Sequence, residues 1–66
     1  MITFEVKDMT CGHCVSTITQ AVKALDAQAR VQVDLASHRV DIEPATADAQ
    51  ALREAIAEAG FTPVAV

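Results

Sequence analysis

The sequence predicts an α+β domain in which a four-stranded antiparallel sheet carries two helices on one face. Three observations support this fold class. Apolar and polar residues alternate in three segments, apolar residues recur at helical spacing in two others, and a short β-branched segment comes last. The resulting order, β-α-β-β-α-β, is the ferredoxin-like arrangement. Because no linker or low-complexity segment interrupts it, residues 1–66 are expected to form a single domain.

The first strand and the first helix are predicted on either side of a polar loop. Alternating apolar residues near the N-terminus have the period of a half-buried strand: Ile2, Phe4 and Val6. Residues 8–12 break that period. From Cys14 onward, apolar residues recur at helical spacing, which predicts an amphipathic helix of about three turns ending near Asp26.

A β-hairpin is predicted in the middle of the chain. Residues 29–35 alternate between apolar and polar, and Val40 and Ile42 continue the alternation after the polar turn at residues 36–38. Pro44 should end the second of these strands, because proline cannot donate a hydrogen bond to a sheet.

The last two elements are a helix and a strand. Thr46 or Asp48 can cap the helix, whose apolar stripe includes Leu52 and Ile56. Gly60 stands where a helix often ends. The remaining segment, residues 61–66, is predicted to form the final strand.

Composition and charge exclude several classes of function. The chain has a net charge of −4 and a pI near 4.8, and its five basic residues are scattered, so nucleic acid and anionic membranes are poor partners. The small aliphatic core leaves little room for a deep substrate pocket, so an enzyme is not expected. Neither a membrane-spanning run nor a signal peptide is visible, and we expect a cytoplasmic protein.

The only two cysteines, Cys11 and Cys14, form a CxxC pair. The predicted elements place Cys11 on a loop and Cys14 at the start of a helix, where the helix dipole favours thiolate over thiol. A thiolate pair can bind a metal or exchange with a disulfide. Position alone does not separate these two chemistries.

Ligand supply favours a soft metal ion. Two thiolates suit Cu(I), whereas structural zinc needs about four ligands. Only His13 and Asp8 lie near the loop in sequence, and neither completes a good zinc set. A two-sulfur site leaves one side open, where a third thiolate can attack and take the metal.

The alternative is a thiol-disulfide oxidoreductase. The chain is short for a glutaredoxin-like fold, and no proline or aromatic residue stands between the cysteines. The one X-Pro pair near the end, Thr62-Pro63, is far from where a substrate-facing loop is expected. The redox function stays as a less favoured alternative.

The stretch Met9-Thr10-Cys11-Gly12-His13-Cys14 resembles the MxCxxC motif of heavy-metal-associated domains, which include bacterial copper chaperones of the Atx1-like type. The element order and Gly60-Phe61 also match, so the resemblance covers essentially the whole chain. It implies that Cys11 and Cys14 ligate Cu(I) and that Met9 is a buried anchor of the loop. It further implies transfer of the ion to a metal-transporting P-type ATPase or its soluble metal-binding domain. Mercury(II) and zinc(II) are the alternative metals.

Two residues depart from the family's commonest pattern. Asp8 replaces a glycine. Its carboxylate would favour a harder ion such as Zn(II) or raise the pKa of the thiols, or it would instead face solvent or cap the turn. Phe61 stands where relatives hold Tyr, Lys or Phe, and it is expected to pack beneath the loop and exclude water.

The two histidines receive different expectations. His13 is expected to be exposed, with metal ligation, for example in a dimer that shares the metal, as its alternative. His38 is expected to be a solvated turn residue. The apo protein is expected to be a monomer that metal can bridge into a dimer.

Overall fold

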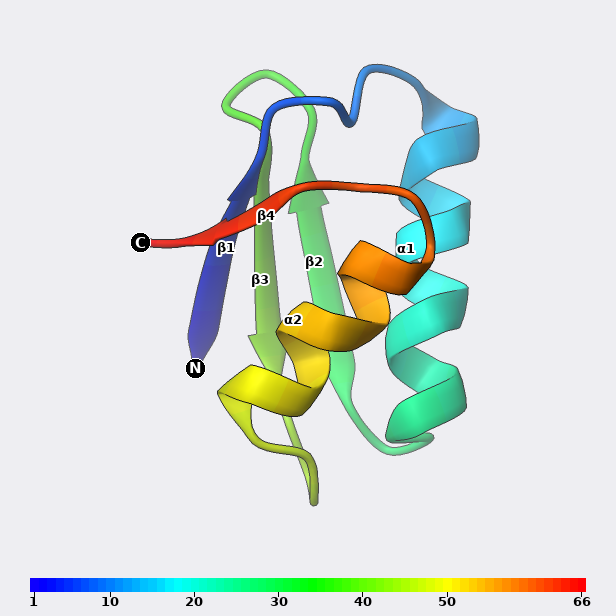
Figure 1. The fold of residues 1–66 in the computed structure, drawn as a ribbon, viewed down its shortest axis with the longest axis vertical. Coiled ribbons are helices and arrows are strands. Elements are labelled where there is room, and N and C mark those ends of the chain that lie inside the picture. The colour runs from blue at the N-terminus through cyan, green and yellow to red at the C-terminus, as the bar shows by residue number, and fades with distance from the viewer.

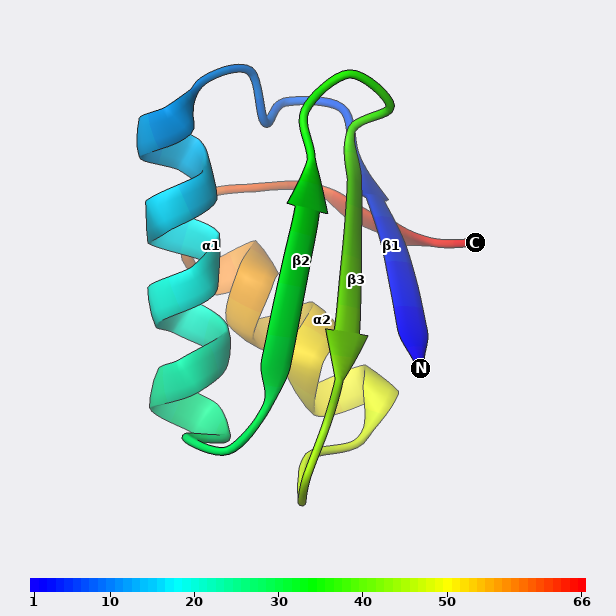
Figure 2. The same ribbon diagram turned by 180° about the vertical axis from the view of Figure 1, so that it is seen from behind.

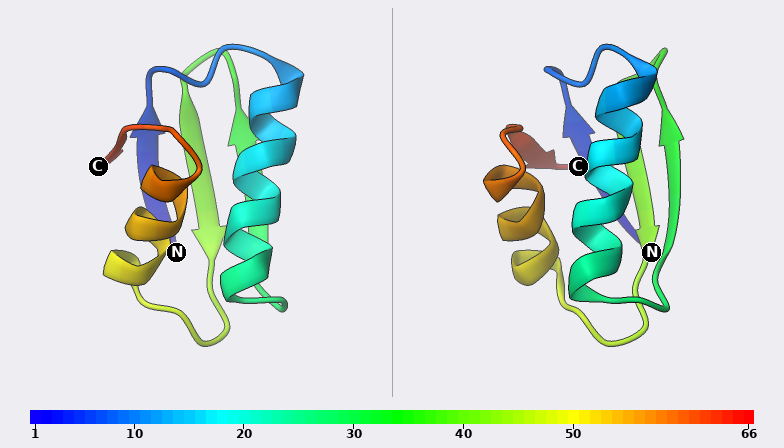
Figure 3. Two further views of the ribbon diagram at one scale, coloured as in Figure 1. Left: turned by 45° about the vertical axis from the view of Figure 1, so that its right-hand side comes forward. Right: turned by 90° about the vertical axis from the view of Figure 1, so that its right-hand side faces the viewer.

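The computed structural model describes residues 1–66 and has the predicted order of elements (Figure 1). The strands and helices are β1 (Ile2–Val6), α1 (Gly12–Leu25), β2 (Arg30–Asp34), β3 (Arg39–Glu43), α2 (Ala49–Glu58) and β4 (Pro63–Ala65). The four strands form one antiparallel sheet in the order β2-β3-β1-β4. Both helices lie on the same face of that sheet (Figure 3). The predicted α+β, ferredoxin-like class is therefore confirmed.

The core lies between the sheet and the two helices. Strand residues that face the helices are buried because side chains alternate between the two faces of a strand, whereas helix residues are buried at spacings of four. Neither helix has the length and apolar character needed to cross a membrane. The buried apolar residues are Phe4, Val6, Met9, Ile18, Val22, Ala29, Val40, Ile42, Leu52 and Ile56.

Two strands are shorter than the sequence predicts. Residues 29–35 were expected to be extended, but β2 spans only Arg30–Asp34, because the N–H of Ala29 bonds to the Asp26 carbonyl and the Asp34 carboxylate holds the N–H of Ala36. Of the expected strand 61–66, only Pro63–Ala65 pairs as β4. The preceding residues instead lead back from α2, and the N–H of Phe61 bonds to the Ile56 carbonyl.

The ends of α2 follow local backbone chemistry. Asp48, rather than Thr46, caps the helix, since its carboxylate accepts the N–H of Ala51 at 2.8 Å. Gly60 follows the last residues of the helix with φ of +102°, a conformation that L side chains rarely adopt. This glycine lets the chain reverse from α2 towards β4.

Asp26 joins the end of α1 to the loop before α2. It is the one buried charged residue, and its Oδ2 accepts the N–H groups of Ala45, Thr46 and Ala47 at 2.8, 2.8 and 3.1 Å. These hydrogen bonds, with those from Thr46 and Ala47 the strongest, hold the pKa of the Asp26 carboxyl below its ordinary value. The carboxylate thus replaces solvent for three consecutive backbone donors.

Replacement of Gly60 by alanine should lower the free energy of unfolding by about 1–2 kcal/mol, the usual cost of a left-handed conformation for a residue with a Cβ. The cause is backbone strain and not a clash, because nothing lies within 4 Å of an added Cβ. Gly12→Ala is the matched control, since Gly12 also has open space around it but begins α1 without a positive φ. Urea denaturation should show Gly12→Ala unchanged or stabilised by up to about 1 kcal/mol. Equal losses in both variants would contradict this explanation.

Acid should destabilise the protein partly through Asp26. Because its pKa is lower in the folded protein than in the unfolded chain, its contribution to stability is complete above the unfolded value of about 4 and disappears as the pH falls through the folded value. The Asp26→Asn variant should be less stable than the wild type at pH 7 and should lose less stability on acidification. Thermal unfolding between pH 7 and pH 2 measures both slopes, and parallel slopes would contradict the assignment.

Candidate metal centre

The two cysteines lie where β1 passes into α1, at one end of the molecule (Figure 1). Cys11 is the N-cap residue of α1, with an extended backbone and no capping hydrogen bond from its side chain. Gly12 begins the helix, and Cys14 lies in its first turn. Cys11 is exposed, whereas Cys14 is half-buried and packs against the core. These positions agree with the predicted loop and helix start.

The two sulfur atoms face each other. The distance from Cys11 Sγ to Cys14 Sγ is 3.3 Å, short enough for one thiol to donate a hydrogen bond to the other sulfur, and both thiols are free. The pKa of the Cys14 thiol is lowered, first by hydrogen bonding from the Thr10 backbone and second by the Cys11 side chain. The site therefore favours the anionic sulfur that soft metals bind.

Met9 attaches the exposed loop to the core. Its side chain is 0% exposed, and its N–H donates to the Val6 carbonyl at 3.2 Å. The structure thus places Met9 inside the core, as expected of an anchor. Thr10, Cys11 and Gly12 follow immediately and are exposed. The chain therefore leaves the core directly after Met9 and reaches the surface before the first cysteine.

His38 corrects an expectation from the sequence. Instead of being solvated, it is half-buried, and its Nδ1 lies 3.0 Å from the Met9 carbonyl oxygen. The His38 carbonyl also accepts the N–H of Val6 at 2.7 Å. With φ of 57°, His38 adopts the left-handed conformation that turns its ring towards the loop. The β2–β3 hairpin therefore supports the loop that carries the cysteines, a role that no local sequence pattern indicates.

Asp8 and the segment after α2 meet on the other side of the loop. Asp8 Oδ1 accepts the N–H of Thr62 at 3.2 Å, so the carboxylate caps a donor far along the chain and not one of its own turn. Phe61 is half-buried against the core beside that contact. The Asp8 carboxylate is thus held by the backbone of the segment after α2 and does not cap its own turn, which the sequence had offered as one alternative.

His13 is exposed at the start of α1. Its carbonyl accepts a hydrogen bond from Thr17 Oγ1 at 3.0 Å, which belongs to the helix and not to a metal site. The structure contains no group of three or more His, Cys, Asp or Glu side chains arranged to hold a metal ion. The site built by the chain itself is thus a pair of sulfur donors.

Comparison with protein families identifies the domain. The heavy-metal-associated domain family matches residues 3–62. The chain belongs to this family. The match includes both cysteines and extends from β1 to the residue before β4.

Two curated proteins illustrate the relationship. The COP-associated protein of Helicobacter felis is 43% identical over 61 residues, with 91% of this chain and 92% of that protein covered. Copper-transporting ATPase 2 of Rhizobium meliloti is 37% identical over 59 residues, which cover 86% of this chain but 7% of the ATPase. The domain therefore resembles both a protein of its own size and a small part of a transporter.

Solved structures give the same result. Copper chaperone Atx1 from Synechocystis PCC6803 superposes with a TM-score of 0.93 at 41% identity, covering 97% of this chain and 100% of the other. A gold binding protein superposes with a TM-score of 0.93 at 38% identity, with 100% of both chains covered. The chain is thus a heavy-metal-associated domain of the copper chaperone type.

The lowered pKa of Cys14 predicts a step in thiolate absorbance at a pH below that at which an ordinary cysteine ionises. Cys14→Ser should lose the step at lower pH. Cys11→Ser should keep most of it, because the larger cause, hydrogen bonding from the Thr10 backbone, remains. Loss of the lower step in Cys11→Ser with retention in Cys14→Ser would contradict the assignment.

Proposed function

We propose that this domain is a cytosolic copper(I) chaperone that binds the ion through Cys11 and Cys14 and transfers it to a metal-transporting P-type ATPase. The observation that carries the proposal is the closely spaced sulfur pair at the start of α1, with Cys11 exposed. The protein acts by binding and release, and the metal is its cargo. The cytosol keeps the thiols reduced, as binding requires.

The donor set supports Cu(I) over zinc(II). Cu(I) prefers soft sulfur ligands, and a structural zinc site needs about four ligands. Asp8, the nearest carboxylate in sequence, has Oδ1 engaged by the Thr62 backbone. Only by recruiting donors from outside the chain would zinc obtain a full set.

Metal binding requires the sulfur pair to open. With the zinc–sulfur distance of about 2.3 Å as a guide, a linear two-sulfur site would separate the sulfurs by about 4.6 Å. The present separation is 3.3 Å. Cys11 can supply the difference because it is exposed and its side chain makes no capping bond, while Cys14 is held in the helix. Cys11 is then the ligand that moves, and Cys14 is the fixed one.

Transfer follows from the same asymmetry. A thiolate of a partner can approach the exposed side of the site and form a third sulfur–metal bond before the bond to Cys11 breaks. Similarity to a segment of a copper-transporting ATPase supports a partner domain that carries an equivalent motif. Between two such domains of similar affinity, transfer would involve only a small change in free energy, since one sulfur replaces another.

Dithiol chemistry is the second candidate function. The 3.3 Å sulfur contact and the lowered pKa of Cys14 also suit formation of a disulfide with an oxidised substrate. A thiol-disulfide oxidoreductase would turn over a disulfide substrate and have a measurable reduction potential. The gold-binding relative and the copper chaperones favour metal binding instead.

Titration of the reduced protein with Cu(I) against a competing chelator tests the proposal. One equivalent should bind tightly, and Cys11→Ser or Cys14→Ser should weaken binding by more than the 10–100-fold that loss of an outer partner typically costs. His13→Ala is the matched control between the two cysteines and should leave the affinity unchanged. Parallel titrations with Hg(II) and Zn(II) rank the alternative metals.

Several results would contradict the assignment. Unchanged Cu(I) binding in both serine variants would exclude the sulfur pair as the site. Tighter binding of Zn(II) than of Cu(I) relative to calibrated chelators would exclude copper as the preferred cargo. Rapid turnover of a disulfide substrate, at a rate that added metal does not change, would favour the oxidoreductase.

A further inference from the structure

The outer edge of β2 has no neighbouring strand within the chain. Strand β2 lies at one margin of the sheet, beside β3 alone, as Figure 2 shows from behind. We infer that this edge is a self-complementary interface, on which β2 of a second copy of the chain pairs antiparallel about Gln32. The dimer extends the sheet from one molecule into the other and does not use the cysteines.

The register of the sheet shows which backbone groups are free. Val6 donates to the His38 carbonyl, so the hydrogen-bonded pairs between β1 and β3 include Phe4 with Val40. By alternation, Arg39, Asp41 and Glu43 direct their backbone groups towards β2. Their partners Arg30, Gln32 and Asp34 are therefore satisfied, and the N–H and C=O of Val31 and Val33 point outward.

No hydrogen bond from a loop or cap reaches these outward groups. None of the backbone hydrogen bonds made by loops and caps involves Val31 or Val33. The opposite edge differs, because β4 has only three residues and begins with Pro63, which has no N–H to offer. Strand β2 contains no proline, so its edge can accept another strand.

The antiparallel register about Gln32 satisfies all of these groups. Val31 then lies opposite Val33 of the second copy, and the two-fold axis repeats the pair, which gives four new N–H···O=C bonds. The side chains of Val31 and Val33 are half-buried on the helix side of the sheet, where they contact each other across the axis. Backbone geometry and apolar contact thus agree on one register.

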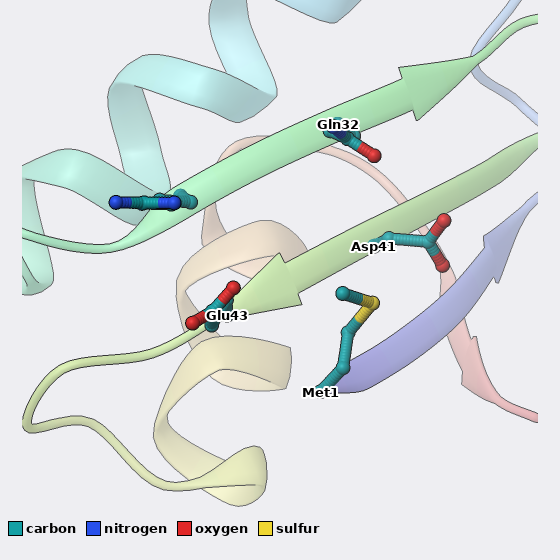
Figure 4. A pocket seen from close by; sticks show the side chains of 5 residues that line it. Met1, Gln32, Asp41 and Glu43 are labelled. Carbon is teal, nitrogen blue, oxygen red and sulfur yellow. The ribbon is translucent and has the colours of Figure 1, made fainter.

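Charge on the open face of the sheet selects the same register. Figure 4 shows Gln32, Asp41 and Glu43 projecting from β2 and β3 on this face. Arg30 lies opposite Asp34 of the second copy, while within each molecule Glu43 flanks Arg30 and Arg39 flanks Asp34. Side chains that are cross-strand neighbours on this face then form a row that runs from one molecule into the other, and their charges alternate in sign along it. The row consists of Glu43 and Arg30 of one molecule, followed by Asp34, Arg39 and Glu5 of the second copy. The second row, generated by the two-fold axis, is identical.

Other registers lose this complementarity. Pairing about Arg30 places two arginines opposite each other, and pairing about Asp34 places two aspartates opposite each other, both of which are repulsive. Pairing about Val31 or Val33 leaves Arg30 or Asp34 opposite an uncharged Gln32. Only pairing about Gln32 gives two opposite-charge pairs.

The geometry keeps both metal loops accessible. The Asp34 end of β2 leads into the hairpin that supports Met9, and antiparallel pairing directs the two Asp34 ends in opposite directions. The cysteine pairs therefore lie at opposite ends of the dimer. This association departs from the expected apo monomer and from a metal-bridged dimer. Because one short strand per molecule forms the contact, the dimer is weak and concentration-dependent.

Sedimentation equilibrium of the reduced, chelator-treated full chain tests the interface. The average mass should rise from 7.0 kDa towards twice that value as the concentration approaches the millimolar range. Hydrogen exchange at the Val31 and Val33 amides should slow over the same range. A mass that stays at 7.0 kDa with unchanged exchange at these amides would overturn the inference.

Charge variants distinguish this interface from any other association. Arg30→Glu and Asp34→Arg each place like charges opposite each other, and each alone should weaken dimerisation by about tenfold or more. An equimolar mixture of the two variants should recover association, because every cross-axis pair is then opposite in charge. Arg53→Glu, on the exposed side of α2, changes the net charge as Arg30→Glu does and should dimerise as the wild type does.

Two outcomes of the variant experiment would overturn the inference. One is a mixture that associates no better than either variant alone, and the other is an equal loss in Arg53→Glu. Circular dichroism checks folding, since Asp34→Arg also removes the acceptor for the Ala36 N–H. If that variant does not fold, Asp34→Asn retains an oxygen acceptor and should still weaken the dimer.

Discussion

The position of the loop that carries the cysteines depends on the burial of Met9. A loop that carries two cysteines has little apolar surface of its own, so it cannot be ordered by a core of its own. Met9 supplies one fully buried side chain at the point where the loop leaves β1. Its N–H is bonded to Val6 and its carbonyl to His38, so the side chain and both backbone polar groups of Met9 are held. The cysteines follow at fixed distances along the chain from this anchor.

The two cysteines of the site are held to different degrees. Cys14 belongs to α1 and packs against the core, whereas Cys11 is exposed and free of capping bonds. For the proposed function, this division would let Cys11 release the ion while Cys14 retains it. The contact between Asp8 and Thr62 holds the opposite side of the loop without placing a carboxylate oxygen on the sulfur pair.

The two ends of the domain are stabilised by different means. At the end that carries the cysteines, the β2–β3 turn and the segment after α2 contact the cysteine loop. At the other end, Asp26 collects three backbone donors of the loop before α2 and ties them to the end of α1. A small domain with a core of ten buried apolar residues depends on such polar contacts, because apolar burial alone is limited at this size. The open face of the sheet and the β2 edge belong to neither of these two sets of polar contacts. They are therefore available for the proposed pairing with a second copy of the chain.

The sequence by itself determined the fold class and the identity of the sulfur pair. Alternation in β1 to β3, helical spacing in α1 and α2, and the CxxC spacing are local signals, and each depends on residues within one element. Only the tertiary structure decided the role of His38, the partner of Asp8 and the burial of Asp26. Each of these contacts joins residues distant in sequence, and a side chain's partner across such a distance follows from packing and not from local pattern. The short extent of β4 has the same origin, since the N–H of Phe61 bonds to the Ile56 carbonyl and the residues before Pro63 lead back from α2.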